Sequence, residues 1–411
     1  MTGEIGVYIA LFVALYFEVF LFVTFFEKIP NLRDPKEKLS YYPSVTILVP
    51  CFNEEKTLKG TLDSLLALDY PKDKLFISVI DDGSRDSTLA IARTFETEPQ
   101  ITVFTKENGG KFTALNLGIK EAQTELVGCL DADSFVAPDA LVEIVKKFNA
   151  NPQAMAVTPA IKIHKPSRLI EYMQATEYTF GIFYKKMFDN LSAIPILPGP
   201  FSIYRREAFD QIGLFRHAHN TEDMEITLRM HKHHLKIENA HTAYVYTTPP
   251  KTIWSLVKQR TRWTQGFIQN SKDYRFMYGN PAYGNLGLFV LPFGFFSIFA
   301  GLYLAGYSLY TLLSYITERL LSAVATGIVP TPSFFSGEFT WFFLQTSVTT
   351  FLVLIAISMT LTIIFIGRKM SEGTVGIRDV LSYLVLYGFV APLWLARAVY
   401  GAVRSRESIW R

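Results

Sequence analysis

Four long apolar runs constrain most strongly how this chain can fold. They cover residues 5–26, 284–315, 339–367 and 379–402, and each is long enough to cross a bilayer as a helix. Hydrophobic residues make up 49% of the 411-residue chain, which is high for a soluble protein of this size. The sequence therefore predicts a membrane protein with one soluble domain between the first and second runs.

The first run is expected to be a permanent anchor, with a cleaved signal peptide as the alternative. No basic region precedes it and no small-residue cleavage site follows it. The residues after it are basic, so the positive-inside rule puts the soluble domain in the cytoplasm; they are Lys28, Arg33, Lys36 and Lys38.

The side of the membrane on which the chain ends stays open. Residues 367–378 are basic and expected in the cytoplasm, so four spans put the C-terminus outside. The tail contains Arg404, Arg406 and Arg411, which favour the inside. A bend at Pro392 that makes the last run re-entrant would resolve this conflict. In the first run, Glu18 either pairs with Arg397 or is protonated without a function.

Residues 44–130 alternate between short apolar strands and helices. Such βαβ units predict a mostly parallel sheet covered on both faces, an α/β fold of Rossmann-like type. Ligands of these sheets bind beyond the strand C-termini, where Asp81-Asp82 and Asp131-Ala132-Asp133 follow two strands and should face one crevice. The expected strands are 44–50, 75–80, 101–105 and 125–130, and the expected helices are 54–70, 86–95 and 112–122.

The second acidic pair suits a hard cation. Asp131 and Asp133 point the same way if the chain stays extended, and Mg²⁺ or Mn²⁺ prefers carboxylate and phosphate oxygens. A solvated turn with an Asp cap is the commoner cause of this pattern when it stands alone. Six histidines between residues 217 and 241 are expected on a solvated helix surface, because no cysteine is near to complete a zinc site.

Two turns could contact a nucleotide. At the first strand end Phe52 could stack on a base, and Glu54 or Asn53 could bond to its edge. A helix N-terminus capped by Asn53 explains the same residues and is compatible with that role. In the Asn-Gly-Gly-Lys turn at 108–111, backbone could approach a phosphate that Lys111 binds as a point charge.

Two segments mix aromatic and basic residues, 165–190 and 252–277. Amphipathic helices of this kind fit a membrane interface, and ordinary domain packing is the alternative. The net charge of +3 does not indicate nucleic acid as a partner.

Four motifs in this order resemble those of the membrane-integrated family 2 glycosyltransferases with a GT-A fold. This branch includes cellulose, chitin, hyaluronan and poly-N-acetylglucosamine synthases, and residues 259–266 look most like the last of these. The resemblance covers about residues 44–270, and Pro198-Gly199-Pro200 departs from the Ser-Gly or Cys-Gly of most relatives. The motifs are Asp81-Asp82, Asp131-Ala132-Asp133, Thr221-Glu222-Asp223 and Gln259-Arg260-Thr261-Arg262-Trp263.

The resemblance implies a role for each matching residue. Asp223, with Glu222 as the alternative, is the expected base that deprotonates the acceptor, and Trp263 is the expected stacking platform for the acceptor sugar. Asp131 and Asp133 are expected to hold Mg²⁺ or Mn²⁺. The residues expected to bind the nucleotide are Phe52, Glu54, Asp81, Asp82, Lys111, Asp131, Gln259 and Arg262.

The resemblance also implies the reaction, an inverting hexosyl transfer from a UDP-sugar, either UDP-GlcNAc or UDP-glucose. The expected product is a growing β-linked polysaccharide, made processively and coupled to secretion. A glycolipid synthase that adds one sugar to a membrane lipid is the alternative, since ceramide glucosyltransferases share the acidic motifs and a related (Q/R)xxRW.

Four regions are expected along the chain: an anchor at 1–30, a GT-A domain at 31–250, interface helices at 251–283, and a C-terminal transmembrane region of about three helices at 284–411. The expected location is the plasma membrane, with the catalytic domain in the cytoplasm. The expected partners are the sugar donor, a polysaccharide or lipid acceptor and the bilayer, with room for an accessory subunit.

Overall fold

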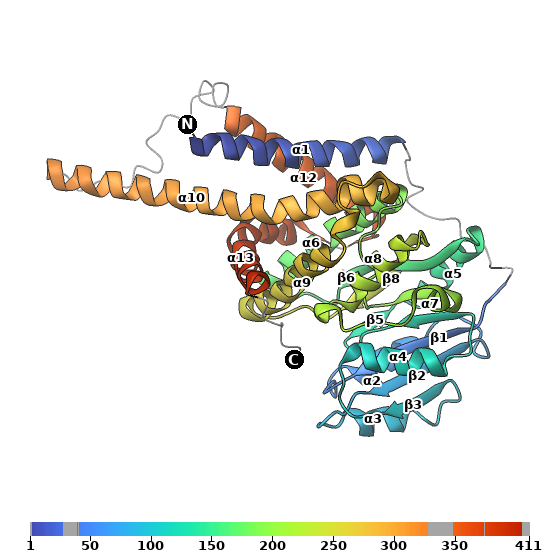
Figure 1. Cartoon of the computed structure of the whole chain (residues 1–411). Coiled ribbons are helices and arrows are strands. Elements are labelled where there is room, and N and C mark those ends of the chain that lie inside the picture. Colours follow the sequence, from blue (N-terminus) through green and yellow to red (C-terminus); the bar gives the residue numbers. More distant parts are fainter. Residues whose placement is uncertain (1, 28–38, 40, 328–347, 374, 405–411) are drawn as a thin grey trace.

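The computed structural model of the chain describes residues 2–27, 39, 41–327, 348–373 and 375–404. An α/β domain occupies one side of the molecule and a group of long apolar helices the other, with two further helices between them (Figure 1). Several residues on which the expected topology depends lie outside the described part: Lys28, Arg33, Lys36, Lys38, Arg406, Arg411 and the start of the run expected at 339–367.

The α/β domain is built on one eight-stranded sheet with the order β3-β2-β1-β4-β7-β6-β8-β5. Strands β3, β2, β1 and β4 are parallel, as the alternating pattern predicts. Strand β7 then runs antiparallel to both of its neighbours, and β5 runs antiparallel to β8. The strands are β1 Val45–Cys51, β2 Leu75–Asp81, β3 Ile101–Thr105, β4 Leu126–Cys129, β5 Ser134–Val136, β6 Ala154–Ile163, β7 Ser202–Arg205 and β8 Lys236–Thr247.

Helices cover both faces of the sheet. Successive side chains of a strand point to opposite faces, so Ile47 and Val49 of β1 pack in one core cluster and Leu48 packs in another. Helices α2 and α5 contribute to the first cluster, and α4, α7 and α8 to the second. These helices are α2 Leu58–Leu66, α3 Thr88–Thr94, α4 Lys111–Glu121, α5 Ala140–Ala150, α7 Arg206–Ile212 and α8 Glu222–Lys232.

Four helices within the described residues are long and apolar enough to cross a membrane. Their apolar side chains are widely exposed, as expected for surfaces that face lipid. Helix α10 is preceded by a short π-helical turn, and α13 continues through Pro392 without ending there. The helices are α1 Thr2–Glu27, α10 Leu291–Thr326, α12 Val348–Met370 and α13 Ile377–Val403.

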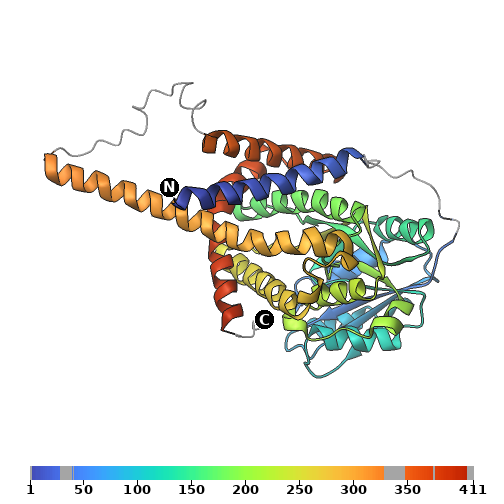
Figure 2. The same cartoon turned by 45° about the horizontal axis from the view of Figure 1, so that its top comes forward.

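Two amphipathic helices join the α/β domain to the apolar helices. Helix α6 (Leu169–Asn190) packs against α12 and α13, and α9 (Ile253–Asp273) packs against α13. Figure 2 shows both helices between the sheet and the apolar group. They correspond to the two aromatic and basic segments of the sequence. These segments therefore pack against the apolar helices and also link them to the α/β domain.

The carboxylate in the first apolar helix has a different partner from the arginine that the sequence offered. The hydroxyl of Thr360 on α12 donates to Glu18 Oε1 at 3.4 Å. The guanidinium of Arg397 instead lies over the ring of Trp254, 4.8 Å from its centroid. Arg397 therefore packs against α9. Of the two alternatives for Glu18, pairing with Arg397 is the wrong one.

Candidate active site

The acidic motifs lie at the carboxyl ends of neighbouring parallel strands. Asp81 is the last residue of β2 and is paired in register with Cys51 at the end of β1. Asp131 and Asp133 follow β4, which pairs with β1 on its other side. The structure thus brings both acidic pairs to one edge of the sheet, where ligands of such folds bind.

The carboxylate of Asp82 holds the glycine turn at 108–111. Asp82 is buried and accepts from Lys106 Nζ at 2.6 Å, from Gly109 N at 3.1 Å and from Gly110 N at 2.9 Å. Gly110 has φ of 89°, a left-handed conformation that a side chain disfavours. Asp82 therefore fixes the start of α4 and with it the position of Lys111.

Lys111 connects two of the acidic motifs. Its ammonium lies 2.6 Å from Asp131 Oδ1 and 3.5 Å from Glu222 Oε1. Burial opposes its charge, but Asp131 and Glu222 outweigh burial and hold the pKa of Lys111 well above its ordinary value. Lys111, Asp131 and Glu222 thus form one charged cluster, which we call the central cluster.

The Pro198-Gly199-Pro200 segment lies directly against the central cluster. A Cβ added at Gly199 would come within 2.6 Å of Lys111 Nζ and 3.0 Å of both carboxylate oxygens of Asp131. The Gly199 carbonyl in turn accepts from Cys129 Sγ at 2.8 Å. The Pro198-Gly199-Pro200 segment, which differs from the usual motif, is therefore in direct contact with the charged residues.

The two acids at the start of α8 have different surroundings. Glu222 faces Lys111, whereas Asp223 Oδ1 accepts from the backbone N–H of Met224 at 2.9 Å. Burial, followed by the negative charge of Glu222, raises the pKa of Asp223 to about 6, against the opposing effect of Lys111. A carboxylate with a raised pKa is suited to take up a proton.

A strained turn precedes these acids. Ala218, His219 and Asn220 have φ of 43°, 57° and 59°, three left-handed residues in succession, and none of them is glycine. Helix α9 holds this turn, because Arg262 donates to the Asn220 carbonyl at 3.0 Å and His219 contacts Asp273 at 2.9 Å. The position of Asp223 is therefore coupled to the helix that carries the Gln-Arg-Thr-Arg-Trp motif.

A second contact between α8 and α9 was not evident in the sequence. Asn270 donates to Thr221 Oγ1 at 2.8 Å, and a Cβ at Gly266 would come within 2.4 Å of that same oxygen. Gly266 and Asn270 are four residues apart and share a face of α9. That spacing of a small and a polar residue was the only signal available.

Arg260 supports Trp263 from behind. The Arg260 guanidinium bonds Glu177 of α6 at 2.8 Å and lies 4.2 Å from the centroid of the Trp263 ring. Trp263 remains 37% exposed, while Arg260 is buried. Glu177 was missed in the sequence because it is one of three acids within an aromatic and basic helix, which was interpreted only as an interface element.

The remaining expected nucleotide residues lie at the end of β1 and on α9. Phe52 follows β1, and Glu54 Oε2 accepts from Thr57 at 2.9 Å, which fits a helix start as well as a ligand site. Gln259 is half-buried on α9, and its Oε1 is buried without a hydrogen-bond partner among the described residues.

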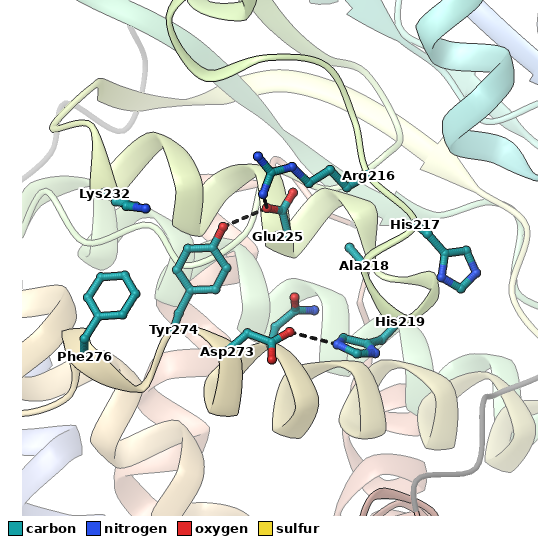
Figure 3. A pocket seen from close by; sticks show the side chains of 10 residues that line it. Arg216, His217, Ala218, His219, Glu225, Lys232, Asp273, Tyr274 and Phe276 are labelled. Carbon is teal, nitrogen blue, oxygen red and sulfur yellow. Dashed lines mark hydrogen bonds and ion pairs between the residues drawn. The ribbon is translucent and has the colours of Figure 1, made fainter.

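A cavity of about 470 Å³ is lined by residues of the strained turn, of α8 and of the end of α9, among them Ala218, Glu225 and Asn270. Figure 3 shows Tyr274 bonded to Glu225 and His219 bonded to Asp273 at its rim. None of the residues expected from the motifs lines this cavity. The site is therefore the strand-end cluster.

The carboxylates fit a divalent cation held together with a phosphate ligand. Within the described part of the chain, no three His, Cys, Asp or Glu side chains are grouped to hold a metal by themselves. Mg²⁺ is usually bound by one or two carboxylates plus substrate phosphates. Asp131 and Asp133 follow β4 through a turn, in which the Ser134 N–H donates to the Asp131 carbonyl at 3.0 Å, and not through the extended chain that would point both side chains the same way.

Comparison with known proteins agrees with the geometry. Residues 46–213 match the family model described as glycosyl transferase family 2. The chain contains a family 2 glycosyltransferase domain. The predicted resemblance is therefore confirmed.

Two relatives of this glycosyltransferase domain are poly-beta-1,6-N-acetyl-D-glucosamine synthases. The one from Staphylococcus epidermidis is 35% identical over 224 residues, which is 54% of this chain and 54% of that protein. The one from Staphylococcus aureus strain COL is 34% identical over 236 residues, 57% of each chain. The chain thus spans about half the length of the curated relatives it matches.

A solved structure supports the fold class. A mannosyltransferase from Pyrobaculum calidifontis in complex with GDP-Man and Mn²⁺ superposes with a TM-score of 0.60 at 20% identity. The match covers 97% of this chain and 100% of that one. The predicted α/β GT-A domain with transmembrane helices is confirmed.

Proposed function

We propose that the protein is a membrane-embedded inverting glycosyltransferase that moves a hexose from a UDP-sugar to a growing β-linked polysaccharide. The central cluster carries this proposal, because it puts the Lys111 ammonium between carboxylates from two of the acidic motifs, next to Asp223. The relatives named as poly-β-1,6-N-acetylglucosamine synthases favour UDP-GlcNAc over UDP-glucose as donor.

Asp223 is the proposed base. In the reaction the acceptor oxygen forms a bond to the anomeric carbon, its proton passes to Asp223, and the bond from that carbon to the diphosphate breaks. Glu222 is the less suitable base, because its carboxylate faces Lys111. One base opposite the leaving group is sufficient for a displacement with inversion.

Positive charge is needed where the diphosphate leaves. Arg262 and Lys111 are proposed to bind it, and Arg262 is oriented by its bond to the Asn220 carbonyl. A divalent cation held by Asp131 and Asp133 would supply further charge there, and the Mn²⁺ of the mannosyltransferase structure supports that assignment.

The nucleoside is proposed to lie along the ends of β1 and β2. Phe52 would stack on the base, and Glu54, Asp81 and Gln259 would bond its polar edges. Asp82 acts on the nucleotide indirectly, because its carboxylate holds the turn that positions Lys111.

We further propose a plasma-membrane location with the catalytic domain in the cytoplasm, where UDP-sugars are made available. The four apolar helices support the membrane location. Processive elongation, coupling to secretion and an accessory subunit belong to the same proposal and rest on the relatives' names and the membrane helices.

Product analysis tests the proposal. The purified protein in nanodiscs is incubated with single UDP-sugars and Mn²⁺ or Mg²⁺, and the products are weighed by mass spectrometry. A ladder of N-acetylhexosamine units is expected with UDP-GlcNAc. A lipid that carries one sugar would instead show the glycolipid synthase, and no transfer from any UDP-sugar would contradict the proposed donor class.

Trp263 and Arg262 are expected to separate acceptor use from donor binding. Arg262→Ala should weaken UDP binding by about 10–100-fold, the value of a charge-assisted hydrogen bond. Trp263→Ala should leave UDP affinity unchanged and stop elongation, because the exposed indole face is lost as a platform for the sugar. UDP affinity is measured by calorimetry and elongation by product length.

Trp254→Ala is the matched control for Trp263. Trp254 lies on the same helix, is 66% exposed and stacks with Arg397 at the apolar helices. Its loss should leave elongation intact. Normal elongation by well-folded Trp263→Ala would remove the acceptor role, and equal losses in both variants would make both residues membrane anchors.

A further inference from the structure

The ammonium of Lys111 occupies a place between two carboxylates from different elements. It lies 2.6 Å from Asp131 Oδ1 and 3.5 Å from Glu222 Oε1. The three side chains are 14%, 30% and 10% exposed respectively, so little water intervenes. Close, poorly solvated pairs interact far more strongly than exposed ones.

The surrounding backbone holds this arrangement in place. The turn before Lys111 is fixed by Asp82, which accepts from Gly109 and Gly110. On the other side Gly199 packs so closely that even a methyl group would collide with the ammonium. The turn and Gly199 therefore hold the stem of Lys111 beside Asp131, while the ammonium at the end of this flexible side chain can still reorient.

This contact conflicts with the second role of the same carboxylate. Under the proposed function Asp131 is a ligand of a divalent cation, at about 2.0–2.1 Å for Mg²⁺. An ammonium and a dication at one carboxylate repel each other at such distances, in a site with little water to screen them. This repulsion disfavours the presence of both cations at Asp131 at the same time.

We propose that Lys111 is an internal counter-ion that competes with the divalent cation for Asp131 and transfers to the diphosphate when the donor binds. This inference rests on the proposed function. Metal and nucleotide then bind cooperatively, because the donor removes the cation that blocks the metal. Coupling of this kind is reciprocal, so the metal also strengthens nucleotide binding by the same factor.

The test measures Mn²⁺ binding directly, without turnover. Full-length protein in nanodiscs is titrated with Mn²⁺, and free Mn²⁺ is followed by electron paramagnetic resonance, without nucleotide and with saturating UDP. In the wild type UDP should strengthen Mn²⁺ binding by at least about tenfold. In Lys111→Met, Mn²⁺ alone should bind at least about tenfold more tightly than in the wild type, and the effect of UDP should shrink.

Lys106 is the matched control. It pairs with Asp82 at the same distance, 2.6 Å, on the neighbouring turn, but does not contact Asp131 by any ion pair recorded for the described residues. Lys106→Met removes the same charge and should change Mn²⁺ affinity by less than about threefold, since the ion pair of Lys106 is with Asp82 and not with a proposed metal ligand. Lys111→Arg keeps the positive charge and should retain the wild-type pattern.

The outcomes separate this inference from the proposed function. Weaker or unchanged Mn²⁺ binding in well-folded Lys111→Met overturns the competition. An equal gain of Mn²⁺ affinity in Lys106→Met also overturns it, because the effect would then come from the loss of any nearby positive charge. Should Lys111→Met fail to fold, Lys111→Gln is used with the same criteria. If the wild type does not bind Mn²⁺ in the presence of UDP, or if Asp131→Asn binds Mn²⁺ as tightly as the wild type, the metal site itself is contradicted.

Discussion

Asp223→Asn is expected to lower the rate of sugar transfer by about 10²–10⁴-fold, the usual contribution of a general base. The amide has nearly the same shape as the carboxylate but cannot accept the acceptor's proton at a useful rate. UDP binding should persist, because the groups proposed to hold the diphosphate are unchanged. Initial rates and UDP calorimetry on the same preparations measure both effects.

Glu222→Gln is the informative comparison for Asp223→Asn. Glu222 lies next to Asp223 and contributes to its raised pKa, but its own carboxylate faces Lys111. We expect a smaller loss of rate than for Asp223→Asn. A loss below about tenfold in Asp223→Asn, with a larger loss in Glu222→Gln, would exchange the two roles.

The pH profile should reflect the raised pKa of Asp223. The base acts only when ionised, so the rate should fall as the pH drops through about 6. In Glu222→Gln this limb should move to lower pH, because a neighbouring negative charge that raises the pKa has been removed. An unchanged limb in that variant would mean that another group titrates.

The same shift predicts an effect on stability that is independent of catalysis. The folded-state pKa of Asp223 lies above the unfolded value near 3.8, so ionising Asp223 costs stability. That cost is absent below about pH 3.8, grows as the pH rises and is fully present above about 6. Asp223→Asn should therefore raise the melting temperature at pH 8, and the gain should vanish as the pH falls through this window.

The strand-end acids could be predicted from the sequence because parallel βαβ units are regular. Each short apolar strand ends next to the polar residue that follows it in the sequence, and the carboxyl ends of parallel strands lie at one edge of the sheet. Asp81 and Asp131 were placed correctly by that rule alone. Helix and strand types in residues 44–130 follow from the same local periodicity.

The antiparallel half of the sheet could not be predicted in the same way. Strand β7 is only four residues long, and it pairs with both β4 and β6 from a distant part of the sequence. Pairings of this kind depend on contacts that local patterns do not encode. The contact of Lys111 with Glu222 has the same origin, since 111 positions separate the two residues.

The interface helices show how one pattern can have two causes. The aromatic and basic residues of α9 were read as a membrane-facing set, yet Arg260 is buried against Glu177 and Trp263. An arginine suits both places, because its charge can lie in water or pair with a carboxylate. Composition cannot distinguish them without the position of α6.

Removal of the divalent cation is expected to stop the reaction. Charge stabilisation by a bound cation is worth several kcal/mol, which corresponds to a rate effect of about 10³-fold. Treatment with EDTA should lower the rate to that extent, and Mn²⁺ or Mg²⁺ should restore it. Initial rates with UDP-GlcNAc over a range of free metal concentrations measure the effect.

Asp133→Ala should produce the same loss and resist rescue by added metal. The Asp133 carboxylate follows β4 and accepts from the Ser134 hydroxyl at 3.4 Å, whereas the hydroxyl of Thr248 donates to the backbone carbonyl of residue 133, which alanine retains. Asp139→Ala is the control: Asp139 is an exposed acid at the start of α5 whose side chain makes no capping hydrogen bond. Its loss should leave the rate unchanged. Full activity in EDTA, or in Asp133→Ala, contradicts the metal requirement and leaves Lys111 and Arg262 as the cations that the leaving diphosphate needs.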